Sequence, residues 1–492
     1  MDSRERAFYQ FLTAWAVLVL WVLPIRSSFW LDETGTYWII KDGVANLIDR
    51  AIHWSGQSPL YYLIAWLAHL AGGRTEVMLR LPSLIAMIAA ALLLYKLAVR
   101  LFDAQTAPFV VLGFACSQQV AFAAADARPY ALAVFLLIGS VWMLVRWLDS
   151  GRPLYAAGYV LLAALTIYAH VLLSIALAGH GIYALHRSRR DGVVKPAALL
   201  AAWSAVGGLA LPLVPQLLVL YRGRSSHAFV GAPNVSEFLA AIAPPLLAAP
   251  VALGLLVGWL GSPRHPLERP KNVAPKKSVL LAAVWALLPL TTLYLFSVFT
   301  RSDLFLPRYY VSAAPGLALL FGWWIRAAAT IRARPIAAAV LVVCASLSFG
   351  SPQHGDADWA GAMAKVRALT AAGDTPVVMA SGFLEATGPE VLAVPSFQEV
   401  LFVPLALYPA GGKLIGLPIH LDAKSQPYLE TIVETDLQHR TRFVLVCEWQ
   451  QKVTYEPWLR GRVASQGFRS ESQGNFGDVD VFLFSRDARA SQ

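Results

Sequence analysis

Long apolar runs separated by short polar connections fill the first 350 residues of the chain. Each run is close to the roughly 20 residues that a helix needs to cross a bilayer, so the pattern predicts about eleven transmembrane helices. The first run ends in Pro24, Ile25 and Arg26 followed by bulky residues. These make a poor signal-peptide cleavage site, and we expect this helix to be retained. The runs 153–171 and 172–186 are the least regular, because both are short and adjoin. The eleven runs are 8–25, 81–101, 106–125, 129–148, 153–171, 172–186, 196–220, 236–260, 279–299, 309–326 and 335–350.

The first connection, 26–80, is too long to be a simple loop. Long loops in compact proteins are usually functional. Within it, 59–70 is apolar but too short to span a bilayer. We expect this stretch to form an interfacial or re-entrant helix.

The pattern changes after residue 350, where short β-branched runs alternate with amphipathic stretches. The runs are 376–380, 442–446 and 479–484, and the helix-like stretches are 359–371 and 425–437. Strands that alternate with helices indicate an α/β domain. The expected organisation is therefore an all-α polytopic membrane domain, 1–350, followed by a small extracytoplasmic α/β domain, 351–492.

The composition agrees with a membrane protein. Hydrophobic residues make up 57% of the chain and charged residues only 14%, against about a quarter in soluble proteins. A mean hydropathy of +0.55 also argues against a nucleic-acid binder, whose basic charge would cover a water-facing surface. Three scattered cysteines, without a CxxC pair, predict no disulfide framework.

The net charge of +10 belongs to the membrane part of the chain. Residues 1–350 hold 28 basic and 14 acidic side chains, and residues 351–492 hold 12 and 16. If the N-terminus is cytoplasmic, the inside connections carry 18 Lys and Arg and the short outside ones carry five. The positive-inside rule therefore predicts a cytoplasmic N-terminus and an extracytoplasmic domain 351–492.

Two adjacent carboxylates, Asp32 and Glu33, follow the first predicted span and are flanked by aromatic residues. One interpretation is that either residue caps the following helix. The other is a carboxylate at the membrane surface that acts as a general base on an acceptor hydroxyl or amine.

The remaining candidate groups also fall at the predicted outside ends of helices, whereas the inside ends hold only the basic charge that sets orientation. Asp126 and Arg128 are either a surface ion pair worth under about 1 kcal/mol or part of a site. His170 is either an interface anchor or a ligand for a divalent ion or a phosphate. Arg308 either snorkels to the headgroups or clamps a phosphate. The other candidates are His53, Gln57 and Arg301.

Several motifs, in order along residues 8 to about 326, resemble the GT-C glycosyltransferases. Within that superfamily they resemble the bacterial branch related to protein O-mannosyltransferases and to the aminoarabinose transferases of lipid A. The motifs are Leu31-Asp32-Glu33, Ser58-Pro59-Leu60-Tyr61-Tyr62, Leu79-Arg80-Leu81-Pro82-Ser83, Ala125-Asp126-Ala127-Arg128-Pro129-Tyr130, Tyr168-Ala169-His170 and Pro307-Arg308-Tyr309-Tyr310 with Pro315-Gly316.

The resemblance implies an inverting enzyme of the bacterial inner membrane. It would move one sugar from a polyprenyl-phosphate carrier to a lipid, glycan or protein acceptor on the extracytoplasmic side. Membrane lipids are expected partners and nucleic acid is not. The implied catalytic residues are Asp32, Glu33 and Asp126. The implied substrate-binding residues are Arg128, Tyr130, His53, Gln57, Tyr61, His170, Arg301, Arg308 and Tyr309.

One departure concerns the donor-phosphate contact. Many relatives carry His or Lys before the Pro-Pro-Leu-Tyr-Tyr element, where this chain has Gln57 and Ser58. A divalent metal ion, Mg²⁺ or Mn²⁺, therefore stays open as a cofactor, and no metal ligand is assigned. Two other functions remain as alternatives: a flippase or transporter for the lipid-linked sugar, and a non-catalytic subunit for envelope assembly. Pocket shape decides the sugar, the acceptor and the carrier length.

Overall fold

The computed structural model contains two compact units, and each is described by itself. Unit 1 comprises Met1–Ile25 and Gly43–Pro352, and unit 2 comprises Arg26–Asp42 and Gln353–Gln492. The structure describes residues 3–53, 58–222, 232–260, 276–302, 304–329, 333–348, 353–371, 373, 375–448 and 451–486.

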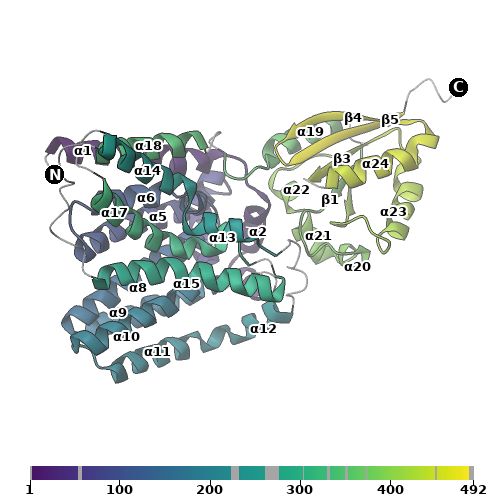
Figure 1. The fold of residues 1–492 in the computed structure, drawn as a ribbon. Coiled ribbons are helices and arrows are strands. Elements are labelled where there is room, and N and C mark those ends of the chain that lie inside the picture. Colours follow the sequence, from purple (N-terminus) through teal and green to yellow (C-terminus); the bar gives the residue numbers. More distant parts are fainter. Residues whose placement is uncertain are drawn as a thin grey trace. The chain divides into compact units, whose positions relative to one another are not determined.

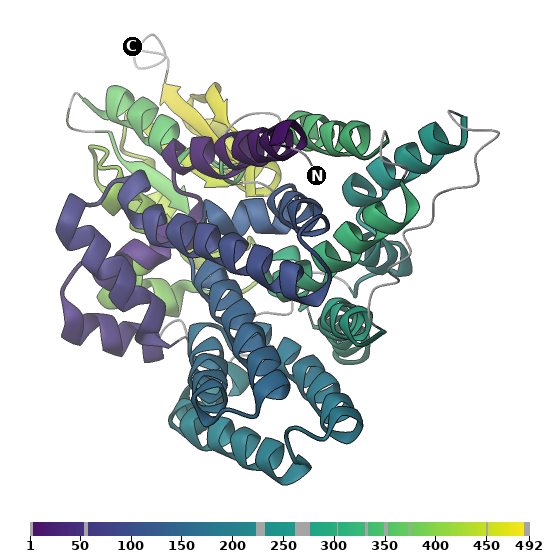
Figure 2. The ribbon, with the colours of Figure 1, turned by 90° about the vertical axis from the view of Figure 1, so that its left-hand side faces the viewer.

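Unit 1 is helical throughout its described part, and its helices are drawn from two directions in Figures 1 and 2. The α-helices are α1 Ser3–Val17, α3 Val44–His53, α4 Pro59–Gly72, α5 Glu76–Leu101, α6 Ala107–Ala115, α7 Gln118–Ala124, α8 Tyr130–Ser150, α9 Pro153–Ala169, α10 Ala176–Asp191, α11 Pro196–Ala210, α12 Val214–Arg222, α13 Val235–Ile242, α14 Pro245–Leu260, α15 Lys276–Thr300, α16 Pro307–Tyr310, α17 Ala314–Ala328 and α18 Ala333–Ser348. Shorter π and 3₁₀ turns are η1 Leu18–Val22, η2 Leu23–Arg26, η3 Leu172–Ile175, η4 Leu211–Leu213 and η6 Val311–Ala313.

The number of membrane spans differs from the eleven that the sequence predicts. Among the described residues, six helices are long and apolar enough to cross a membrane, or up to eight if each bent pair is one span. The chain is thus a multi-pass membrane protein, and eleven spans are not confirmed. The run 106–125 is bent by 70° between α6 and α7, and the run 236–260 is bent by 57° at Pro244. Hydropathy alone cannot register such a bend, because both halves of each run are apolar.

Close helix packing in unit 1 depends on two glycines of α17. A Cβ atom at Gly316 would lie 2.5 Å from the backbone nitrogen of Ala286 in α15. A Cβ at Gly322 would lie 2.8 Å from the backbone nitrogen of Val110 in α6. Small residues let helix backbones approach in membrane proteins. Helix α17 therefore packs tightly against two neighbours at once.

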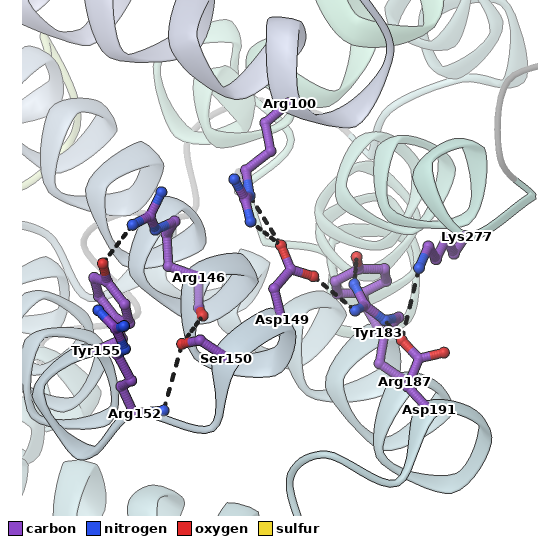
Figure 3. Close-up of polar contacts among 10 residues, drawn as sticks. All are labelled: Arg100, Arg146, Asp149, Ser150, Arg152, Tyr155, Tyr183, Arg187, Asp191 and Lys277. Atoms are coloured by element: carbon purple, nitrogen blue, oxygen red, sulfur yellow. Dashed lines mark hydrogen bonds and ion pairs between the residues drawn. The ribbon is translucent and has the colours of Figure 1, made fainter.

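An ordered charge network ties four helices together at one end of unit 1 (Figure 3). Asp149, at the end of α8, accepts hydrogen bonds from Arg100 of α5 at 2.5 and 2.8 Å and from Arg187 of α10 at 2.8 Å. Arg187 also donates to Asp191, which lies 3.7 Å from Lys277 of α15. The expectation that these helix ends hold only basic orientation charge is wrong. Both carboxylates are bound by cations from neighbouring helices.

Unit 2 is an α/β domain around a mixed sheet with strand order β2-β1-β3-β5-β4. Strands β2, β1 and β3 are parallel, whereas β5 pairs antiparallel with β3 and β4. The α/β class and three of the strands agree with the sequence analysis, which did not predict β2 or β4. The strands are β1 Val377–Ala380, β2 Leu414–Leu417, β3 Arg442–Glu448, β4 Phe468–Phe476 and β5 Val479–Arg486. The helices are α2 Leu31–Ile40, α19 Trp359–Thr370, α20 Pro389–Leu392, α21 Pro395–Leu401, α22 Val403–Leu407, α23 Gln426–Ile432, α24 Lys452–Val463 and the turns η7 Val433–Leu437 and η9 Ala464–Gln466.

The segment Arg26–Asp42 is part of unit 2, although the sequence analysis grouped it with the membrane domain. The Phe29 amide donates to the hydroxyl of Tyr408 at 3.1 Å, and the indole of Trp38 donates to Glu399. Lys41 forms an ion pair with Glu399 at 3.0 Å. The start of the long first loop is therefore part of the C-terminal α/β unit. The residues that hold it there are more than 350 positions apart in the sequence.

Candidate active site

Five of the predicted substrate-binding residues gather in unit 1, where α7, α8, η3 and α16 meet. The ring of His170 lies 5.1 Å from that of Tyr130 and 5.8 Å from that of Tyr309. The guanidinium of Arg308 lies 5.2 Å from the centroid of the Tyr309 ring. The charges of Arg128 and Arg308 both act on His170. We call Arg128, Tyr130, His170, Arg308 and Tyr309 the cationic cluster.

The cationic cluster is linked to two other motifs by hydrogen bonds. The hydroxyl of Tyr61 in α4 lies 3.0 Å from the hydroxyl of Ser83 in α5. Ser83 in turn donates to the backbone carbonyl of Arg128 at 3.3 Å. Both Tyr61 and Ser83 are buried. Three motifs that are separate in the sequence thus fix the backbone from which the Arg128 side chain extends.

Two residues of unit 1 sit at breaks in helices. Asp126 lies in the connection between α7 and α8 and is fully buried, which excludes a surface ion pair with Arg128. His170 follows the last residue of α9 in an extended conformation, with φ −161° and ψ 114°. Its Nδ1 is buried and has no hydrogen-bond partner among the described residues. A buried imidazole nitrogen beside two arginines is a polar group that a bound substrate can satisfy.

The adjacent carboxylates of unit 2 have different environments. Glu33 is fully buried in the first turn of α2, and its side chain accepts a hydrogen bond from the Trp30 amide at 3.2 Å. The capping interpretation therefore fits Glu33. Asp32 is half-buried at the second position of the same helix. It remains accessible for chemistry in a way that Glu33 does not.

The carboxyl edge of the parallel strands surrounds the start of α2. An added Cβ at Gly382, just after β1, would lie 1.9 Å from Oε2 of Glu448 and 2.8 Å from a methyl of Leu31. Burial raises the pKa of Glu448 to about 8, with further contributions from the negative charges of Asp478 and Asp32. Ligands of α/β sheets bind outside the carboxyl ends of the strands. Asp32 lies at such an edge.

Buried groups of the kinds that bind divalent cations occur in both units. In unit 2, Nε2 of His354 lies 3.9 Å from Oε1 of Glu33, and both side chains are buried. In unit 1, Asp126 is a buried carboxylate. Magnesium typically takes one or two protein carboxylates together with water and substrate phosphate. These donors therefore fit a divalent ion, and no cofactor is established.

Three predicted residues are not part of the cationic cluster. His53, at the end of α3, is exposed and bonds to Asp49 at 2.9 Å. Arg301 is exposed after α15 with a positive φ of 51°. Gln57 lies outside the described residues.

Sequence reasoning missed three residues that the structure brings into the site regions. Ser83 was quoted only as part of a motif, and its position two turns from the end of a long apolar helix does not reveal the bond to Arg128. Glu448 ends a β-branched strand, and a carboxylate at the end of a parallel strand is a usable signal. His354 follows the last predicted span, and a histidine at the predicted outside end of a span is also a usable signal for a site residue.

The chain is similar to known proteins in part of its sequence and in its fold. Residues 56–215 match the family of dolichyl-phosphate-mannose-protein mannosyltransferases. The crystal structure of ArnT from Cupriavidus metallidurans in the apo state is similar at 12% identity, over 98% of each chain, with a TM-score of 0.57. The same protein bound to undecaprenyl phosphate is similar at 12% identity, over 96% of this chain and 97% of that chain, with a TM-score of 0.54. No curated protein matches the chain in sequence.

The fold and the family match over residues 56–215 agree with the resemblance to GT-C glycosyltransferases that the sequence motifs predicted. Its family match and structural neighbours are glycosyltransferases that use lipid-linked sugar donors. The chain is accordingly a multi-pass membrane protein with a fold similar to that of ArnT, and the family match over residues 56–215 supports a glycosyltransferase.

Proposed function

We propose that this protein is an inverting glycosyltransferase that moves a single sugar from a polyprenyl-phosphate carrier to an acceptor on the extracytoplasmic side of the bacterial inner membrane. The cationic cluster of unit 1 is the observation that carries this proposal. The similar ArnT is known with undecaprenyl phosphate bound, which supports a polyprenyl-phosphate donor.

Arg128 and Arg308 bind the donor phosphate in this proposal. A guanidinium group matches phosphate oxygens with two parallel hydrogen bonds. When the bond from the anomeric carbon to phosphate breaks, negative charge develops on the leaving polyprenyl phosphate, and fixed arginines stabilise it. Tyr130 and Tyr309 hold the edges of the cluster through ring contacts. His170 offers its buried Nδ1 to the same phosphate or to a sugar hydroxyl.

Asp32 of unit 2 acts as the general base. It removes the acceptor proton while the acceptor oxygen or nitrogen attacks the anomeric carbon in line, and the bond to the phosphate oxygen breaks with its electron pair going to phosphate. Glu33 fixes the first turn of α2 and therefore positions Asp32. Tyr61, bonded to Ser83, orders the backbone at Arg128.

A divalent cation would find ligands in Glu33 and His354 of unit 2 or in Asp126 of unit 1. When bound, such an ion would neutralise part of the donor phosphate's charge. His53, Gln57 and Arg301 remain predicted substrate contacts. The excess of Lys and Arg in alternate connections supports a cytoplasmic N-terminus and an extracytoplasmic unit 2.

The flippase and assembly-subunit alternatives have no specific observation in their favour. A transporter binds its substrate near the bilayer midplane between repeated halves. The candidate groups of unit 1 instead lie where helices α7, α8 and α9 begin or end.

The test compares two substitutions in purified protein supplied with a polyprenyl-phosphate-linked sugar and an acceptor. Asp32→Asn should lower transfer at least about 100-fold while donor binding is kept, since only proton removal is lost. Arg308→Gln should weaken donor binding as well as transfer. Arg190→Gln, which removes an exposed arginine from the end of α10, is the charge-matched control. Wild-type transfer by Asp32→Asn would show that Asp32 is not the base.

A further inference from the structure

A pair of arginines brackets the tight connection between α8 and α9, at the opposite end of α8 from Tyr130. Helix α8 has 21 residues, so the two ends are roughly 30 Å apart. Helix α8 ends at Ser150, Gly151 adopts the left-handed conformation with φ 67°, and α9 begins at Pro153. The Ser150 hydroxyl donates to the Arg146 carbonyl at 2.8 Å and accepts from the Arg152 amide at 3.4 Å. This connection is therefore fixed on both sides (Figure 3).

The side chain of Arg146 is held by aromatic groups rather than by a carboxylate. Its Nη2 donates to the hydroxyl of Tyr155 at 2.5 Å. Its guanidinium carbon lies 4.9 Å from the centroid of the Tyr155 ring and 5.8 Å from that of Trp142. Because the Tyr155 oxygen accepts this hydrogen bond, its own hydrogen is left to donate, and no described residue accepts it. Arg146 and Tyr155 thus both present donors.

The two acidic groups nearest to this connection in the charge network, Asp149 and Asp191, are already bound to other cations. Asp149 is shared by Arg100 and Arg187, and Asp191 is shared by Arg187 and Lys277. Within the described ranges, no carboxylate forms an ion pair with Arg146 or Arg152. These two arginines lie on one short connection, at the level where a membrane-spanning helix ends. They therefore carry positive charge that no carboxylate of the described residues neutralises.

We propose that Arg146, Arg152 and the Tyr155 hydroxyl bind the phosphate of an anionic phospholipid headgroup, such as phosphatidylglycerol. A guanidinium fork and a phenolic hydrogen are complementary to phosphate oxygens. Aromatic side chains such as Trp142 and Tyr155 are typical of the membrane interface, where headgroup phosphates lie. This site is independent of the donor site and of the proposed sugar transfer.

The test measures lipid retention by native mass spectrometry of the full-length protein released from nanodiscs that contain phosphatidylglycerol and phosphatidylcholine. The wild-type protein should retain phosphatidylglycerol in preference to phosphatidylcholine. The double variant Arg146→Gln/Arg152→Gln should lower that retention at least tenfold, because two charge-assisted contacts are lost. Tyr155→Phe should lower it about tenfold, as expected for the loss of one hydrogen bond to a charged phosphate.

The matched control is Arg189→Gln/Arg190→Gln, which removes the same charge from exposed arginines at the end of α10. Retention by this control should equal that of the wild-type protein. Equal losses in both double variants would mean that only the overall charge attracts lipid and would overturn the proposed site. Displacement of the lipid by millimolar inorganic phosphate would identify a free-anion site instead, and it too would overturn the proposal.

Discussion

The pH dependence of stability caused by Glu448 tests whether this buried carboxyl lies close to Asp32. Glu448 ends β3, and burial raises its pKa from 4.5 to about 8, with the charges of Asp478 and Asp32 acting in the same direction. Between these two pH values the folded protein holds a proton that the unfolded chain releases. The stability of unit 2 should therefore fall as the pH rises from about 4.5 to about 8.

The size of the effect follows from the shift. One pKa unit corresponds to about 1.4 kcal/mol, so the full shift would correspond to roughly 5 kcal/mol. Because part of the Glu448 residue surface remains exposed, we expect about 2 kcal/mol. Glu448→Gln is neutral at every pH and close in shape to the protonated acid. It should match the wild-type protein near pH 4 and exceed its stability by about 2 kcal/mol above pH 8.

Hydrogen–deuterium exchange of strand β1 in the full-length protein measures this difference. At one pH the intrinsic exchange rates of the two proteins are the same, so the ratio of their rates reports the difference in opening free energy. Glu471→Gln, on the exposed face of β4, is the control and should leave the ratio near one. Asp32→Asn should reduce the pH dependence, because it removes one of the charges that raise the pKa of Glu448. A rate ratio for Glu448→Gln that does not change with pH would refute the reasoning.

Three further predictions concern unit 1. Gly316→Ala and Gly322→Ala should each destabilise the protein by about 1–3 kcal/mol, because the new methyl meets backbone atoms of a neighbouring helix. A lower midpoint of thermal unfolding in detergent would show this loss. Gly207→Ala and Gly208→Ala, which face open space in α11, should leave the midpoint unchanged. Asp149→Asn should lower the free energy of unfolding by about 3 kcal/mol, since the buried Arg187 loses one of its two carboxylate partners. An unchanged midpoint in the same assay would contradict the charge network. Tyr61→Phe should cost about 1 kcal/mol and reduce transfer, and full activity would argue against positioning of Arg128 through Ser83.

The sequence predicted the class of fold because hydropathy and strand patterns are local properties. The long apolar run that became α8 and the β-branched run that became β3 were both visible in this way. Strand β2 was not predicted, because its four residues, Leu414–Leu417, include a glycine and show no alternation of apolar and polar residue types. The bends after α6 and α13 were also invisible, since a helix break inside an apolar run changes the direction of the chain but not its composition.

The candidate site was predicted in part for a related reason. The motifs that contain Arg128, His170 and Arg308 indicated residues at helix ends, and the structure brings these three together. The position of Asp32 depends on contacts with residues far along the chain, such as the bond from Phe29 to Tyr408. No local pattern encodes such a contact. The hydrogen bond from Ser83 to the carbonyl of Arg128 likewise depends on how separate segments of the chain pack.

The measurement that tests the central claim most directly is the release of free polyprenyl phosphate. Purified full-length protein in liposomes is supplied with a polyprenyl-phosphate-linked sugar and candidate acceptors, and the lipids are analysed by mass spectrometry. A glycosyltransferase releases polyprenyl phosphate as the sugar appears on the acceptor, and Arg308→Gln should lower the rate of release. Movement of the intact sugar-loaded carrier between leaflets, without any free polyprenyl phosphate, would contradict the account.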